Sequence, residues 1–292
     1  MASVTLQAFA KVNLGLDVLG SRENGYHDVR MVMQTIDLFD TLRFTSIPED
    51  EIRITTSDTK IPTGEKNLVY QAILLMKREF AVKKGMEVYI DKHIPVAAGM
   101  AGGSADCAAA LKACNLLFEL HLSEEALMDY GKSLGADVPY CIMGGTALAE
   151  GIGEKLTKLP ALPDCHILVA KPPMEVSTGE VYRGFDAEKH VVHPDIDGMI
   201  KALHNENLDG VTARMVNVLE NVTIRLHPEV LVLKDTVRTA GAKNAMMTGS
   251  GPTVFGIFTD HVLAEDARNE IVAQGLTREV YVVAPVNEIS ER

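Results

Sequence analysis

A glycine-rich segment that runs directly into an alanine-rich stretch constrains this chain more than any other feature. Residues 95–120 read PVAAGMAGGSADCAAALKACNLLFEL. Because alanine is the strongest helix former, we expect a loop that feeds a long buried helix over about residues 104–120. Gly99, Gly102 and Gly103 would let backbone amides approach an anion where the helix dipole favours negative charge. The pattern predicts a phosphate-binding loop, and a plain flexible turn before a helix is the alternative that it leaves open.

This segment does not fit the two most familiar nucleotide motifs. It lacks the GxxxxGK[ST] spacing of a P-loop, since Lys112 lies eight residues beyond Ser104. No GxGxxG in the chain follows a strand and opens a helix with an acidic residue downstream. A nucleotide that binds this chain must therefore bind in another way.

Periodicity predicts a mixture of helices and strands. Alternation from Val4 to Phe44, interrupted at Asn24 and Gly25, indicates strands joined through a turn. Apolar residues at helical spacing predict a helix over 67–80, and alternation resumes over 86–90. Further helices are expected over 123–134, 197–203, 212–219 and 228–239, with strands at 166–170, 245–248, 254–259 and 279–283. The fold class is therefore α+β, with two-layer lobes.

The length of 292 residues predicts two lobes with a cleft between them. The segment 159–163, LPALP, reads as the linker. We accordingly expect one domain over 1–158 and a second over 159–292. The cleft between them is the natural place for a ligand.

Composition excludes several classes of protein. With 47% hydrophobic and 23% charged residues the chain is an ordinary globular protein, and its net charge of −12 argues against nucleic acid or anionic lipid as partners. No basic segment followed by an apolar stretch opens the chain, and no run of about 18 apolar residues follows, so no membrane association is expected. Cys107, Cys114, Cys141 and Cys165 lack CxxC spacing and read as buried fillers rather than metal ligands or disulfides, which predicts a cytoplasmic protein.

The glycine-rich segment carries a family resemblance. Residues 95–106 resemble the PxxxGLGSSA-type signature of the GHMP kinases, in the GGGSSDAA form of those that act on 4-diphosphocytidyl-2-C-methyl-D-erythritol. Ala101 replaces the first glycine of that form and Ala105 its second serine; both are small, so the backbone cradle should survive without a second hydroxyl for Mg²⁺. An NL element at Asn67 and Leu68 matches the family's adenine pocket, although Leu68 would equally serve as the first core residue of a helix. The residues that the resemblance assigns to ATP binding are Pro95, Val96, Ala97, Ala98, Gly99, Met100, Ala101, Gly102, Gly103, Ser104, Ala105, Asn67 and Leu68.

Two further motifs of the same family carry the expected chemistry. Residues 8–28 resemble its AKxNLxLxVxGxRxDGYHxL pattern, with Lys11 and Asn13 on one face of a strand. Asp137 lies in LGADVP, where the family's aspartate is the proposed base that accepts the substrate proton. Lys11 is its expected partner, holding the carboxylate ionised and stabilising developing charge. Taken alone, Asp137 would read as a helix cap and Lys11 as a solvated strand lysine.

The cytidine part of such a substrate needs aromatic and polar side chains. Tyr26 and His27 of the GYH element and Tyr182 of VSTGEVY, which also carries Thr178, resemble the family's cytidine site. The two tyrosines would sandwich the base and His27 would contact its edge. Each of these residues taken singly is more often a packing residue. A second glycine turn, MTGSGPTVF at 247–255, resembles the third GHMP motif and would close over the phosphate region.

The resemblance implies a GHMP kinase fold, with an ATP-binding lobe over 1–158, a substrate-binding lobe over 159–292 and the active site between them. It implies phosphorylation of the 2-hydroxyl of the cytidyl substrate in non-mevalonate isoprenoid synthesis. ATP with Mg²⁺ would be the co-substrate, with no protein metal ligand predicted. The protein would act on a small molecule as a monomer or homodimer. The alternatives are another GHMP kinase, of homoserine or mevalonate type, and a catalytically silent nucleotide-binding regulator.

Overall fold

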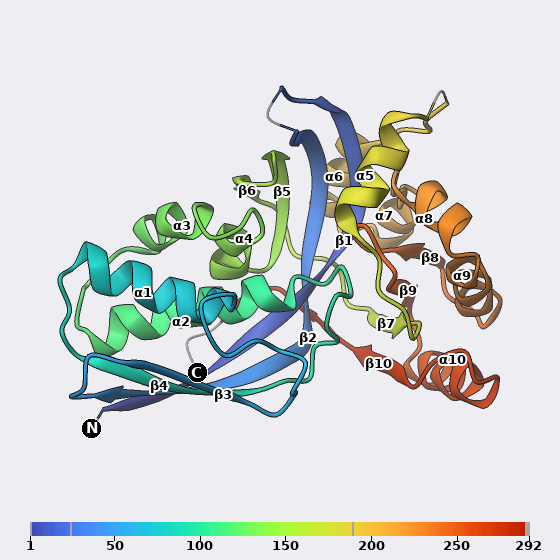
Figure 1. Ribbon diagram of the computed structural model, residues 1–292. Helices are drawn as coiled ribbons and strands as arrows, with labels where there is room; N and C mark the ends of the chain where they lie inside the picture. The colour runs from blue at the N-terminus through green and yellow to red at the C-terminus, as the bar shows by residue number, and fades with distance from the viewer. Residues whose placement is uncertain (1, 24, 189, 290–292) are drawn as a thin grey trace.

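The computed structural model describes residues 2–23, 25–188 and 190–289, which form two sheets with helices packed against them (Figure 1). The first sheet has the strand order β3-β4-β2-β5-β6, and β1 and β11 also pair with β2. Its strands are β1 (Ser3–Ser21), β2 (His27–Ile47), β3 (Ile52–Thr56), β4 (Gly85–Asp91), β5 (Thr146–Gly151), β6 (Lys155–Lys158) and β11 (Pro285–Val286).

The two longest strands, β1 and β2, form an antiparallel pair that runs through the whole first sheet. One end of β2 pairs with β4 over 41–47, and the other end pairs with β5 over 29–34. The predicted strands of this region are confirmed, whereas Asn24 of the predicted turn lies outside the described residues. The pair therefore reaches both the helical layer and the second sheet.

Helices α1 (Leu68–Glu79), α2 (Gly102–Leu117) and α4 (Val138–Met143) pack on one face of the first sheet, and α3 (Glu124–Lys132) packs on α2 and α4 (Figure 1). The alanines of α2 are buried, and this helix contacts α1, α4 and β1, because small side chains allow close approach on several sides. Cys107 and Cys114 are fully buried in the same core, so the expected filler role is confirmed for both.

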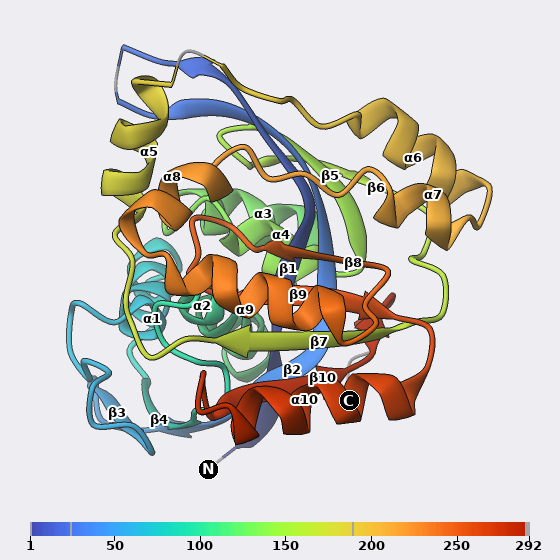
Figure 2. The ribbon, with the colours of Figure 1, turned by 90° about the vertical axis from the view of Figure 1, so that its right-hand side faces the viewer.

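The second sheet has the strand order β10-β7-β9-β8, and it is antiparallel. Its strands are β7 (His166–Lys171), β8 (Asn244–Met247), β9 (Val254–Phe258) and β10 (Glu279–Val283). The helices of this half are α5 (Thr178–Asp186), α6 (Ile196–His204), α7 (Leu208–Thr212), α8 (Glu220–Leu226), α9 (Glu229–Thr239) and α10 (His261–Ala273). Figure 2 shows α9 and α10 lying over this sheet, which agrees with their contacts to its strands. None of the helices in the described ranges has the length and apolarity needed to cross a bilayer.

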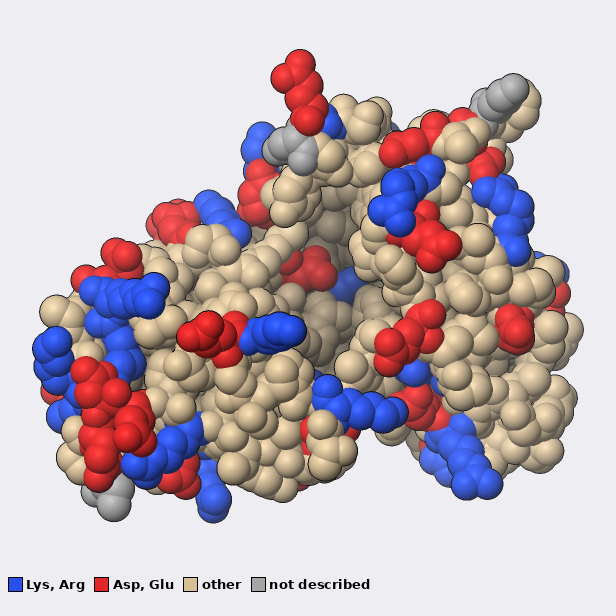
Figure 3. Space-filling model, in the orientation of Figure 1, with Lys and Arg blue, Asp and Glu red and all other residues tan. Residues whose placement is uncertain are grey.

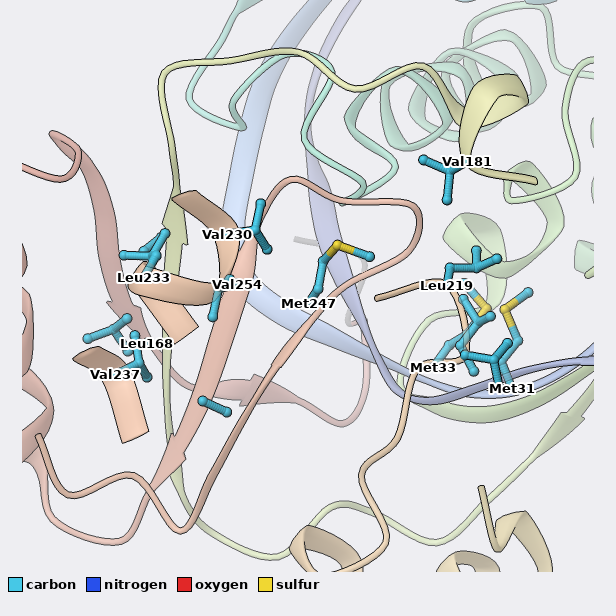
Figure 4. Packing of buried hydrophobic residues seen from close by; sticks show 14 of the residues in the cluster. Met31, Met33, Leu168, Val181, Leu219, Val230, Leu233, Val237, Met247 and Val254 are labelled. Atoms are coloured by element: carbon cyan, nitrogen blue, oxygen red, sulfur yellow. The ribbon is translucent and has the colours of Figure 1, made fainter. Parts of the chain in front are cut away.

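The core runs continuously from one sheet to the other. In Figure 4, Leu168 and Val237 pack together within the second half, while Met31 and Met33 of β2 lie beside Leu219. All of these residues belong to one buried cluster. In addition, β11 returns from the second half to pair with β2. The proposed domain division at residues 158 and 159 stays a prediction.

The predicted helix over 212–219 is wrong. Helix α7 ends at Thr212, and the segment that follows lies alongside β1. The Leu16 amide donates to the Val216 carbonyl oxygen (3.0 Å), and the Val218 amide donates to the Leu16 carbonyl oxygen (3.1 Å). These long-range bonds take up the backbone groups that a helix would pair locally. Helices α4, α5, α7, α8 and α10 were not predicted.

Candidate active site

Two cavities meet at the glycine-rich loop. One, of about 370 Å³, lies between the loop and the start of α1. The other, of about 640 Å³, opens between the two halves of the molecule. Gly99, Ala101 and Ser104 line both. Figure 3 shows the hollow between the halves, with acidic and basic side chains on its floor.

The loop presents the start of α2 to both cavities. Ala101 is the N-cap residue of this helix, in the left-handed conformation (φ 59°), and its side chain makes no cap hydrogen bond. The first amides of α2 are thus not satisfied by a capping side chain and can bind an anion. The positive φ explains why the family signature has glycine at this position.

The second glycine turn, around Gly249, packs against the first, around Gly99, with backbone atoms facing backbone atoms. A Cβ on Gly99 would lie 2.6 Å from the Thr248 carbonyl oxygen, and one on Gly249 would lie 3.0 Å from the Gly99 carbonyl oxygen. The Asn13 amide donates to Thr248 Oγ1 (3.0 Å), which brings β1 to the same point. Segments from both halves of the chain therefore build the junction of the two cavities.

Lys11 and Asn13 lie side by side in the larger cavity, on the same strand face as predicted. The Lys11 ammonium donates to Asn13 Oδ1 (2.8 Å) and to the Gly99 carbonyl oxygen (3.0 Å). Its side chain is buried, so it is not the solvated lysine of the alternative interpretation. In the part of the chain that the structure describes, the ammonium is held by an amide oxygen and a carbonyl oxygen, and its expected partnership with Asp137 stays a prediction.

Asp137 lines the same cavity, at the N-terminus of α4. Its side chain makes no cap hydrogen bond, so the capping alternative is not realised. Burial raises the pKa of the nearby Cys141 thiol; the Asp137 carboxylate raises this pKa further, and the Lys11 ammonium opposes it. Both charges therefore act on the thiol of Cys141, a residue of α4 that is only partly buried, unlike the other three cysteines.

The remaining predicted substrate residues line the same cavity. The rings of His27 and Tyr182 are 4.7 Å apart between centroids, tilted by 38°. Burial, with a smaller contribution from the Asp137 carboxylate, raises the pKa of Tyr182 to about 12. Thr178 Oγ1 lies 2.9 Å from Ser250 Oγ, and Tyr26 is 57% exposed at the rim. The structure thus gathers all seven predicted catalytic and substrate residues around one space.

Known proteins resemble this chain over nearly its whole length. The model of the GHMP kinase N-terminal domain matches residues 67–145, and that of the GHMP kinase C-terminal domain matches residues 192–276. A 4-diphosphocytidyl-2-C-methyl-D-erythritol kinase of Lachnospira eligens is 56% identical over 281 residues, covering 96% of this chain and 98% of that one. The chain belongs to the GHMP kinase family.

Solved structures of this family confirm the fold. A crystal structure of a 4-(cytidine 5'-diphospho)-2C-methyl-D-erythritol kinase superposes with a TM-score of 0.80 at 30% identity, covering 97% of this chain and 99% of that one. A homoserine kinase from Cytophaga hutchinsonii superposes with a TM-score of 0.78 at 20% identity, covering 99% of this chain and 96% of that one. The latter resemblance shows the GHMP fold alone. The predicted fold class is confirmed.

Most of the residues predicted to bind ATP line the smaller cavity, but Met100 and Ala105 do not. The Met100 side chain packs in the core beneath the loop. The Ala105 side chain, in the first turn of α2, packs in the core against which this helix lies. Their side chains cannot touch a nucleotide, although their backbone belongs to the loop. Lys60 and Lys66 also line this cavity, although sequence reasoning did not single them out.

A buried charged cluster beside the loop was also missed. Lys92, which lines the smaller cavity, pairs with Asp106 (2.8 Å) and with Asp40. Burial raises the pKa of Asp106 to about 7; the Lys92 ammonium lowers this pKa, and the Asp40 carboxylate raises it. Burial alone would lower the pKa of Lys92, but the two carboxylates outweigh burial and raise it. The sequence signal for this cluster was a lysine, Lys92, shortly before Pro95. The carboxylates that pair with it lie elsewhere in the sequence, so the lysine alone did not reveal them.

Proposed function

We propose that this GHMP kinase transfers the γ-phosphoryl group of ATP to the 2-hydroxyl of 4-diphosphocytidyl-2-C-methyl-D-erythritol, in non-mevalonate isoprenoid synthesis. One observation carries the proposal: a single cavity joins the phosphate loop to two chemically distinct groups of side chains. Lys11 and Asp137 form one group, Tyr26, His27 and Tyr182 form the other, and all five line the cavity. The name of the 56% identical relative supports the same substrate.

The reaction needs positioning and charge more than covalent chemistry. The triphosphate would lie against the amides at the start of α2, and the acceptor hydroxyl would face it from the larger cavity. Asp137 would take the proton of that hydroxyl as the new oxygen–phosphorus bond forms, and the bond from the γ-phosphorus to ADP breaks. Lys11, held by Asn13 and Gly99, would stabilise the charge that develops on the transferred group.

Mg²⁺ would neutralise charge on the triphosphate, and the residues beside the loop fit such a cation. The described residues contain no cluster of three His, Cys, Asp or Glu side chains that could hold a metal alone. Magnesium, however, is commonly bound by one or two carboxylates together with substrate phosphates. Asp106 lines the ATP cavity, and its Oδ1 is buried without a hydrogen-bond partner in the described part of the chain. Asp106 and the Ser104 hydroxyl are the protein groups that would hold the ion.

Other GHMP activities are less well supported. A homoserine or mevalonate kinase has no need for the packed rings of His27 and Tyr182 in the larger cavity. A silent regulator would have no reason to keep Lys11 and Asp137 in one cavity. The free cysteines, of which Cys107, Cys114 and Cys165 are buried, support a cytoplasmic location.

ADP release with Mg-ATP tests the substrate. The panel would contain 4-diphosphocytidyl-2-C-methyl-D-erythritol, homoserine, mevalonate and galactose, and we expect turnover with the cytidyl compound alone. Turnover with another acceptor would refute the substrate assignment. Silence with all four, from folded protein that binds ATP, would favour the regulator.

Asp137→Asn tests the base. Because this carboxylate makes no cap hydrogen bond, the variant should keep the fold and ATP affinity while kcat falls by about 10²- to 10⁴-fold. Asp129→Asn, on an exposed side of α3, serves as the matched control and should keep wild-type turnover. Near wild-type kcat in folded Asp137→Asn would remove Asp137 from the mechanism.

A further inference from the structure

Asp186 is tied to a residue of the substrate cavity but belongs to none of the family motifs. It is the last residue of α5, and its Oδ1 lies 2.7 Å from Nε2 of His27, the first residue of β2. The His27 side chain is 8% exposed and its ring packs against Tyr182. The histidine ring is thus held from two sides by one helix.

The carboxylate fixes where the imidazole carries its proton. An ionised carboxylate only accepts hydrogen bonds, so the proton between the two groups lies on Nε2. In the neutral ring the other nitrogen, Nδ1, is then a bare acceptor. Within the described ranges, the hydrogen bond of the His27 ring is the one to Asp186, through Nε2, and Nδ1 has no partner there. His27 is therefore left with an acceptor to offer a ligand.

We propose that Asp186 makes the site selective for cytosine over uracil by holding His27 in this tautomer. The inference rests on the proposed function, since it takes the base of the substrate to lie against His27. Cytosine carries an exocyclic amine, a donor, where uracil carries a carbonyl oxygen, an acceptor. An acceptor on the histidine pairs with the amine and repels the carbonyl oxygen. Asp186 is a positioning residue, because it acts through His27.

Asp186 is not needed merely to tie the second half to the strand pair β1 and β2. Arg30 of β2 pairs with Asp197 of α6 (2.6 Å), and Asp17 of β1 pairs with His193 (2.7 Å). These contacts bridge the same two parts of the molecule. Removing the Asp186 carboxylate should therefore leave the halves docked and change only the histidine ring.

The experiment compares kcat/KM for 4-diphosphocytidyl-2-C-methyl-D-erythritol with kcat/KM for its uridine counterpart, at saturating Mg-ATP. The wild-type enzyme should prefer the cytidine compound by at least about tenfold, because a polar site left with an unpaired group rejects the wrong partner. In Asp186→Ala this ratio should fall by about tenfold or more, through a higher KM for the cytidine compound and with kcat within about threefold.

The matched control is Asp197→Ala, which also removes an exposed aspartate that pairs with β2 and should keep the wild-type ratio. An unchanged ratio in an active Asp186→Ala enzyme, or a wild-type enzyme that does not discriminate, would overturn the inference and leave the proposed function standing. A wild-type enzyme without turnover of the cytidine compound would overturn both.

Discussion

A single carboxylate that lines the smaller cavity, Asp106, affects how stability depends on pH. A carboxyl group in an unfolded chain ionises near pH 4. In the folded protein burial raises the pKa of Asp106 to about 7, with Lys92 opposing and Asp40 adding to the shift. Between these values the folded state keeps a proton that the unfolded state has lost. The contribution of Asp106 therefore makes the protein less stable as pH rises through this window.

Asp106→Asn should flatten that dependence, because the amide cannot ionise yet still offers an oxygen to Lys92. Chemical denaturation at pH 5 and pH 7 would measure the free energy of unfolding. Over this interval it should fall by up to about 3 kcal/mol more in the wild type than in the variant. Asp129→Asn, a change of an exposed carboxylate, should keep the wild-type slope. Equal slopes in Asp106→Asn and the wild type would show that Asp106 is ionised throughout.

At the scale of elements, the two glycine turns stand in direct backbone contact and tolerate little change. Gly99 has φ 71°, and a Cβ there would lie 2.6 Å from the Thr248 carbonyl oxygen. Gly99→Ala should therefore lower stability by about 1 kcal/mol or more. It should also lower kcat/KM, since the loop must move to make room for the methyl group. Gly20→Ala has open space around its Cβ and should leave kcat/KM unchanged. Activity measurements and thermal unfolding of both variants would check this, and an unaffected Gly99→Ala would show that the loops can separate.

Elements whose signal is local could be predicted from the sequence. The helix after the glycine loop and the helix capped by Asn67 follow from composition and spacing, and both were found. Residues 213–219 were misassigned because Leu16, distant in sequence, determines their backbone pairing. Lys92 was missed for a similar reason, since Asp40 makes it significant and lies 52 residues away. Motifs pointed to the candidate site residues, but only the fold shows which of them touch.

At the scale of the whole molecule, the end of the described chain fastens the second half to the first. Strand β11 pairs with β2, and Gln34 Nε2 donates to the Val286 carbonyl oxygen (3.1 Å). A chain ending at Ala284 should lose these bonds and unfold at a lower urea concentration by far-UV circular dichroism. A chain ending at Ile289 keeps them and should match the full-length midpoint. An unshifted midpoint in the shorter chain would show that β11 contributes nothing to stability.

The shared wall of Gly99, Ala101 and Ser104 has a consequence for inhibition. On the proposed function, a nucleotide analogue that fills only the smaller cavity leaves the larger cavity open to a cytidine analogue, and the reverse also holds. Two such inhibitors would not exclude each other. Joined by a short linker passing this wall, they would form one bisubstrate ligand whose second half binds at high effective concentration.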